Sequence, residues 1–133
     1  MKLNRRNFIS ASAGIAATIS SPMVFGASRP KVVVIGGGAG GATAARYIAK
    51  DSKGAIDVTL VEPTRSYYTC FFSNLYLGGF RDFDSIGHSY GKLASDYGIN
   101  VVHDWAVDVD SSGKTVSLAG GGTVNYDKLI LSP

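Results

Sequence analysis

Four short apolar runs are spaced along this chain. Lys31–Ile35 (KVVVI) and Asp57–Val61 (DVTLV) are nearly continuous in apolar residues. Ile99–His103 and Lys128–Leu131 have the same character near the end of the chain. Strands of a parallel sheet are covered on both faces, so they are apolar along their length instead of alternating. The runs therefore predict a parallel sheet.

A helical repeat separates the first two runs. From about Gly40 to Asp51, apolar side chains recur at the spacing of one helix face, with Ala44, Ala45 and Ile48 pointing inward. The helix is expected to end at Lys53-Gly54. Strand, helix and strand together make one βαβ unit of about 30 residues.

The rest of the chain mixes loop, helix and strand patterns. Pro63–Phe80 is an aromatic-rich loop and Asp84–Tyr97 is expected to be a helix. Val107–Val109, Thr115–Leu118 and Val124–Tyr126 alternate apolar and polar residues around glycine turns, which predicts an antiparallel β-meander. The expected fold class is α/β, a Rossmann-like parallel sheet with an added meander.

A glycine-rich turn follows the first strand. Residues 36–41 read GGGAGG and fit the pattern G-x-G-x-x-G. Gly36 allows the tight turn, Gly38 lets the backbone approach a pyrophosphate, and Gly41 lets the helix pack on the strand. Free N–H groups at the helix start would bind the phosphates. The predicted contacts are Gly36, Gly38, Ala39, Gly40 and Gly41.

An acid stands where such a motif requires one. Glu62 ends the second strand, 21 residues after Gly41. In this position a carboxylate accepts hydrogen bonds from ribose hydroxyls and repels a 2′-phosphate, so NADP is not expected. The motif by itself does not distinguish NAD from FAD.

Cys70 is the single cysteine of the chain. It cannot form an internal disulfide, so it is buried as a small apolar side chain, paired between chains or used chemically. Its place just after the nucleotide motif favours a flavin held near the thiol.

The remaining candidates have simpler interpretations. His88 is expected at a helix start, and His103 is expected to make a local hydrogen bond beside Asp104. Trp105 is expected to pack. The sequence shows neither an acid–base pair nor a cluster of metal-ligating residues, so no catalytic or metal-binding residue is assigned.

Composition and charge exclude nucleic acid as a partner. Apolar residues make up 45% and charged residues 17%, which is typical of a globular domain. The net charge is +3, but the first 28 residues contain Lys2, Arg5 and Arg6 and no acid. Ten basic and ten acidic residues remain, without a basic stripe.

Residues 1–28 have the pattern of an export signal. Asn4–Ile9 (NRRNFI) resembles the twin-arginine motif, and the apolar stretch Phe8–Ile19 is too short to span a membrane. An ordinary secretory signal or an uncleaved tail are the alternatives. We expect the twin-arginine route and a periplasmic location, because the paired arginines are followed by Phe8 and a weakly apolar stretch. This route carries folded proteins and suits a protein that takes up a cofactor before export.

Five segments together resemble one family, the flavoprotein subunit of flavocytochrome c sulfide dehydrogenase. That subunit belongs to the FAD-dependent pyridine nucleotide-disulfide oxidoreductases. The segments are Val32–Ala45, Val58–Pro63, Tyr67–Asn74, Val101–Asp104 and Tyr126–Pro133. The resemblance implies FAD as cofactor, attached through an 8α thioether to Cys70. It also implies a cofactor contact at Pro63 and contacts from the backbone of Ala106 to the adenine.

The resemblance implies more than these residues supply. It implies oxidation of sulfide and transfer of electrons to a c-type cytochrome subunit. Family members are longer and carry a second nucleotide-binding domain and a redox-active cysteine pair. We therefore expect residues 29–133 to be the N-terminal part of an FAD-binding domain that leaves apolar surface uncovered, binds flavin poorly and is inactive alone. The alternatives are a sulfide:quinone reductase, an NADH-dependent flavin disulfide reductase and a non-catalytic nucleotide-binding module.

Overall fold

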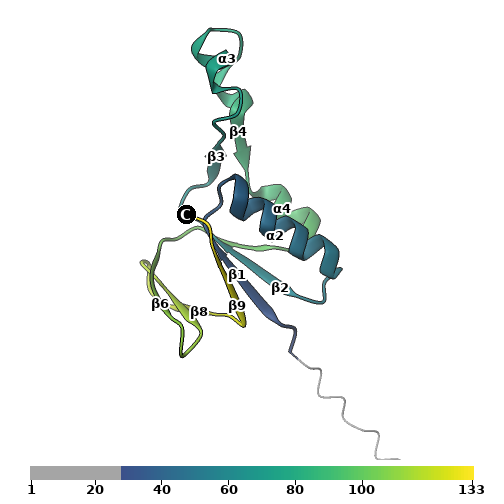
Figure 1. Cartoon of the computed structure of the whole chain (residues 1–133), viewed down its shortest axis with the longest axis vertical. Helices are drawn as coiled ribbons and strands as arrows, with labels where there is room; N and C mark the ends of the chain where they lie inside the picture. The colour runs from purple at the N-terminus through teal and green to yellow at the C-terminus, as the bar shows by residue number, and fades with distance from the viewer. Residues whose placement is uncertain (1–27) are drawn as a thin grey trace, which may run out of the picture.

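A four-stranded parallel sheet forms the centre of the computed structural model, which describes residues 28–133 (Figure 1). Its strands are β1 (Lys31–Ile35), β2 (Asp57–Val61), β5 (Asn100–Val102) and β9 (Lys128–Leu131), in the order β5-β2-β1-β9. Every neighbouring pair is parallel. All four carboxyl ends therefore lie at one edge of the sheet, where ligands bind in sheets of this kind.

Both faces of the sheet are covered. On one face Val32 and Val34 of β1 pack in a core with Ala45 of α2 (Ala39–Ser52). On the other face Val33 packs against Val116. Consecutive residues of β1 thus enter opposite cores, which explains why the strand is apolar throughout.

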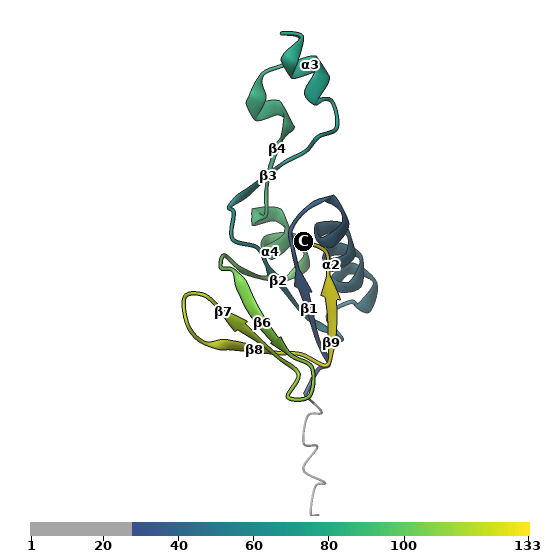
Figure 2. The ribbon, with the colours of Figure 1, turned by 60° about the vertical axis from the view of Figure 1, so that its left-hand side comes forward.

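The second face is covered by the predicted meander (Figure 2). Its strands are β6 (Ala106–Asp110), β7 (Thr115–Leu118) and β8 (Thr123–Asn125), all antiparallel. The β6–β7 register shifts between Ala106 and Asp108, which marks a bulge. The predicted fold class, a Rossmann-like sheet with a β-meander, is confirmed.

The region after β2 differs from the prediction. The predicted loop contains β3 (Ser66–Tyr68) and α3 (Ser73–Leu77), and the predicted helix over 84–97 is wrong in its first half. A 3₁₀ turn η1 (Phe83–Ile86) leads into β4 (Gly87–Ser89), which pairs antiparallel with β3. Residues 66–89, called the arm below, project from the sheet (Figure 2). Within the predicted helix over 84–97, the α-helical part is α4 (Gly91–Tyr97).

The spacing of two buried side chains explains the error. Ile86 and Tyr90 are four residues apart and both almost fully buried, which is the pattern of one helix face. They lie at opposite ends of β4 and are buried in different places. Ile86 accepts a backbone hydrogen bond from Thr69 in the arm, whereas Tyr90 belongs to the core beside α2.

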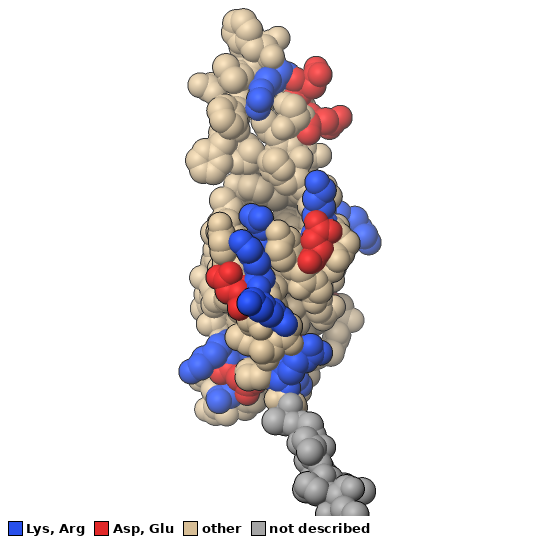
Figure 3. Space-filling view, turned by 90° about the vertical axis from the view of Figure 1, so that its right-hand side faces the viewer, with Lys and Arg blue, Asp and Glu red and all other residues tan. Residues whose placement is uncertain are grey.

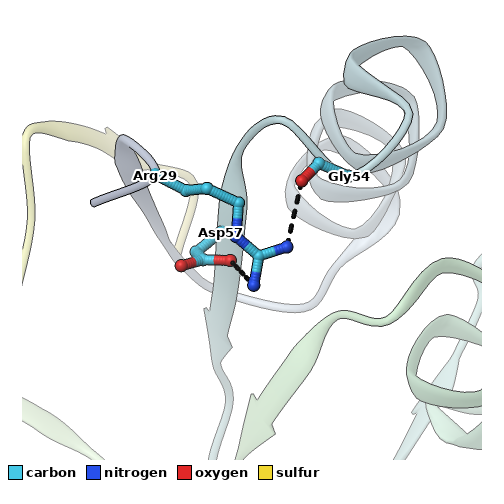
Figure 4. A network of polar contacts seen from close by, with 3 residues as sticks. All are labelled: Arg29, Gly54 and Asp57. Carbon is cyan, nitrogen blue, oxygen red and sulfur yellow. Dashed lines mark hydrogen bonds and ion pairs between the residues drawn. The ribbon is translucent and has the colours of Figure 1, made fainter. Parts of the chain in front are cut away.

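Charged groups tie the start of the described chain to the sheet. Arg29 forms an ion pair with Asp57 at 3.0 Å and donates a hydrogen bond to the carbonyl of Gly54 at 3.0 Å (Figure 4). Acidic and basic side chains are interspersed on the face shown in Figure 3, without a continuous basic stripe there. Among residues 28–133, no helix combines the length and the apolar character that crossing a membrane requires.

Candidate functional site

Two glycines of the turn between β1 and α2 are fixed by backbone contact. Gly36 has φ +100°, and a Cβ atom on it would lie 2.0 Å from the carbonyl oxygen of Ser132. A Cβ on Gly41 would lie 1.9 Å from the carbonyl oxygen of Gly36. Because these neighbours are backbone atoms, neither position accepts a side chain. Gly36 is therefore required for the tight turn, and Gly41 for the close approach of α2 to that turn.

Gly38 differs from both, because nothing lies within 4 Å of where its Cβ would be. It is the N-cap of α2, in extended conformation, and it lines a cavity. The first N–H groups of a helix have no acceptor within the helix, and the first turn of α2 contains no acid. The open space beside Gly38 therefore suits an anion such as a pyrophosphate.

Glu62 is held against the glycine turn. Its Oε2 accepts the N–H of Gly37 at 2.7 Å. Its Oε1 accepts the N–H of Thr64 at 2.9 Å and the hydroxyl of Thr64 at 2.6 Å. Partial burial raises the pKa of Glu62, but these hydrogen bonds outweigh burial and leave its pKa below the ordinary value. The carboxylate is therefore ionised and ready to accept further hydrogen bonds.

Tyr90 braces the same turn from the start of α4. Its hydroxyl donates to the carbonyl of Gly37 at 3.0 Å. Because the N–H of Gly37 donates to Glu62, both backbone polar groups of Gly37 are hydrogen-bonded. Burial, and then the nearby Glu62 carboxylate, raise the pKa of Tyr90 and keep it a donor. Sequence reasoning missed Tyr90, because a contact across 53 residues leaves no local signal.

The turn and the end of β2 form a cavity of about 310 Å³ at the carboxyl edge of the sheet. A loop following β5 completes its wall. The cavity brings together these predicted residues: Gly36, Gly38, Glu62, Pro63 and Ala106. Ala39 and Gly40 begin α2 beside it, and Gly41 is buried in the helix packing. A larger hollow of about 460 Å³ at the amino ends of β1 and β2 contains none of the predicted residues.

Cys70 lies apart from this cavity, in the arm, and its thiol is exposed. The carbonyl of Cys70 accepts hydrogen bonds from the N–H and hydroxyl of Ser73, at 3.2 and 2.9 Å. Phe71 and Phe72, which follow it, are both about 60% exposed. Cys70 is thus an exposed residue beside two exposed aromatic rings, not a buried small side chain. Attachment of a flavin to it stays a prediction.

Three lesser interpretations need correction. His88 lies in β4 opposite Tyr67, not at a helix start. The contact of His103 is not the local hydrogen bond expected beside Asp104, because its Nδ1 lies 3.2 Å from the carbonyl oxygen of Glu62, 41 residues earlier in the chain. Trp105 is 66% exposed and lines the cavity, so it does not pack in the core.

The lowered pKa of Glu62 predicts a loss of stability in acid. A folded-state pKa below the ordinary 4.5 contributes stability that is present above that value and lost as pH falls through the folded-state pKa. Solvent screens this half-buried group, so we expect its ionisation to contribute less than about 1 kcal/mol to the free energy of unfolding. Between about pH 6 and pH 3, the free energy of unfolding measured in urea should fall less for Glu62→Gln than for the wild type. An equal fall in both proteins would contradict a lowered pKa of Glu62.

The fold and the site define a dinucleotide-binding domain of the Rossmann type. The sequence profile of the pyridine nucleotide-disulphide oxidoreductases matches residues 30–133. The chain belongs to this family, and the family predicted from the motifs is confirmed.

Two enzymes that act on sulfide, by their names, are similar to this chain in sequence. The flavoprotein chain of sulfide dehydrogenase [flavocytochrome c] from Chlorobaculum thiosulfatiphilum is 54% identical over 44 residues, which cover 33% of this chain and 90% of that sequence. Sulfide-quinone reductase from Aquifex aeolicus is 31% identical over 103 residues, covering 76% of this chain and 23% of the reductase.

A solved structure gives the same result for the fold. Water-forming NADH oxidase from Lactobacillus brevis superposes with a TM-score of 0.70 and 27% identity, over 77% of this chain and 24% of the oxidase. The chain therefore spans about a quarter of the length of this structure and of the sulfide-quinone reductase.

Proposed function

We propose that this chain is the FAD-binding part of an exported oxidoreductase of the sulfide dehydrogenase type, which passes electrons from sulfide through a flavin to a c-type cytochrome. The observation that carries the proposal is the cavity in which the open side of Gly38 faces the same space as the Glu62 carboxylate. The similarity to a flavocytochrome c flavoprotein chain supports sulfide as the electron donor and a c-type cytochrome as the acceptor.

Each residue of the cavity has a definite task in this proposal. The N–H groups at the start of α2 bind the pyrophosphate, and Gly38 leaves room for it. Glu62 accepts ribose hydroxyls while Thr64 and Gly37 hold the carboxylate in place. Tyr90 keeps the turn from rotating. FAD, when bound, accepts two electrons together and releases them singly.

Cys70 is proposed to hold the flavin covalently. Cys70 is exposed, and its carbonyl accepts hydrogen bonds from Ser73, so its thiol is accessible on a locally ordered turn. A thioether replaces one hydrogen of the flavin 8α-methyl group with the sulfur. The reaction releases two protons and two electrons, which an oxidant such as molecular oxygen takes up.

Two alternatives have support of their own. The identity to sulfide-quinone reductase extends over more of the chain and favours a quinone as acceptor. The likeness to an NADH oxidase favours a nicotinamide as reductant. A non-catalytic nucleotide-binding module would use the same cavity without any reaction.

The reaction is tested in the longest natural protein that contains this chain. Purified protein with bound flavin is mixed anaerobically with sulfide, and the flavin absorbance is followed. Bleaching by sulfide, followed by reduction of added cytochrome c, is the expected result. Bleaching by NADH but not by sulfide, or electron transfer only to a quinone, would support the alternatives. Bound flavin that no donor bleaches would indicate the non-catalytic module.

Export is the remaining part of the proposal, and its signal lies outside the described residues except for Ser28. Replacing Arg5 and Arg6 with lysine keeps the charge but removes the paired arginines. We expect this double variant to be absent from the periplasmic fraction, while the wild type is found there. Unchanged export would indicate a general secretory signal.

A further inference from the structure

The cavity contains an aromatic side chain to which the proposed function gives no role. Trp105 lies in the loop between β5 and β6 and is the one aromatic among the residues that line this cavity. Its side chain is 66% exposed. Single exposed apolar residues are common on protein surfaces, so exposure alone does not indicate a function. The position of Trp105 in the lining of the cavity does indicate one.

The order of the strands places Trp105 where the base of a bound dinucleotide belongs. Phosphates at the start of α2 lie beyond β1, and a ribose at Glu62 lies beyond β2. The base leaves the ribose on the side away from the phosphates. It therefore continues along the sheet edge towards β5, the next strand, which is followed by the Trp105 loop.

The backbone of Trp105 is fixed on both sides. Its N–H donates to Oδ1 of Asp104 at 2.7 Å, and its carbonyl accepts the N–H of Ala119 at 2.9 Å. The Asp104 carboxylate also accepts the N–H of Gly120, at 3.0 and 3.2 Å. The loop is thus tied to the β7–β8 turn, while the indole itself is left in solvent.

A bulge lies immediately after this residue, between Ala106 and Asp108 of β6. Bulges bend a strand and redirect side chains, and they are common beside binding sites. Here the bulge follows the point at which the chain leaves the cavity wall and enters the meander. A fixed backbone with an exposed indole is the arrangement of a preformed stacking surface.

We propose that Trp105 stacks on the adenine of the bound nucleotide and so contributes to the affinity of this site for adenine nucleotides. This inference rests on the proposed function, because it assumes a nucleotide in the cavity. Stacking of a base on an aromatic ring strengthens binding, roughly fivefold or more for each base by alanine substitution. The ring also adds a contact to the base that the glycine turn and Glu62 do not supply.

The test uses ADP, which carries the base, ribose and pyrophosphate but needs no flavin site. Trp105 is the single tryptophan of the chain, so its fluorescence reports on this position alone. In the full 133-residue chain, ADP should quench that fluorescence saturably. By calorimetry, Trp105→Ala should bind ADP roughly 5- to 50-fold more weakly, and Trp105→Phe should regain most of the loss.

A control separates stacking from a general effect of removing an aromatic. Tyr47→Ala removes a half-exposed ring from α2, outside the cavity, and should bind ADP like the wild type. Both alanine variants should keep the wild-type melting temperature, because neither ring is buried. Equal ADP affinity in the wild type and Trp105→Ala would overturn the stacking role and leave the nucleotide site intact. A wild-type chain that binds no ADP would overturn both.

Discussion

Gly41→Ala is expected to lower the free energy of unfolding by about 3 kcal/mol or more. The new Cβ would lie 1.9 Å from the carbonyl oxygen of Gly36, and that oxygen belongs to the turn itself. Relief requires α2 to move away from β1, which opens the core formed by Ala45 and Val34. Urea unfolding of the full chain, followed by far-UV circular dichroism, measures the loss.

Gly38→Ala is the matched control, because it makes the same chemical change three residues earlier in the same turn. Its Cβ would meet no atom within 4 Å, and its backbone lies in a region open to alanine. We expect a stability within about 1 kcal/mol of the wild type. If both variants lost equal stability, the glycines would not divide into a packing position and an open position.

The second large effect concerns Cys70. In the longest natural protein that contains this chain, Cys70→Ser should abolish covalent flavin, because the proposed thioether forms at the sulfur of Cys70, which is exposed in the structure. After denaturation and precipitation, flavin fluorescence should remain in the wild-type pellet and move entirely to the supernatant in Cys70→Ser. The folded protein should be little affected, since the side chain is exposed.

Ser73→Ala is the control for this experiment. It removes the hydroxyl that donates to the Cys70 carbonyl but leaves the thiol in place. We expect its pellet to retain flavin. Release of flavin from the denatured wild type, with Cys70 free to react with an alkylating reagent, would contradict the tether.

The parts of the fold predicted correctly depend on short stretches of sequence. The βαβ unit from Lys31 to Glu62 is encoded by apolar runs, glycines and one acid, all within about 30 residues. The meander is encoded by alternation around glycine turns. In both cases the neighbours in space are also neighbours in sequence, so a local pattern was sufficient.

The errors arose where distant residues decide the structure. Ile86 and Tyr90 have helical spacing, yet the antiparallel pairing of β3 with β4 separates them. The bond from Tyr90 to the Gly37 carbonyl spans 53 residues. A single Trp105 between two short strands indicates a packing role, because large aromatics are usually well buried, but the strand order brings it to the cavity. None of these contacts has a signature within one segment.

The central claim is that the space beside Gly38 holds the pyrophosphate of an adenine dinucleotide. Calorimetric titration of ADP into the full wild-type chain and into Gly38→Ala tests it most directly. A methyl group in that space should weaken ADP binding by roughly tenfold to a hundredfold at unchanged stability. Equal binding of ADP by the two folded proteins would contradict the claim.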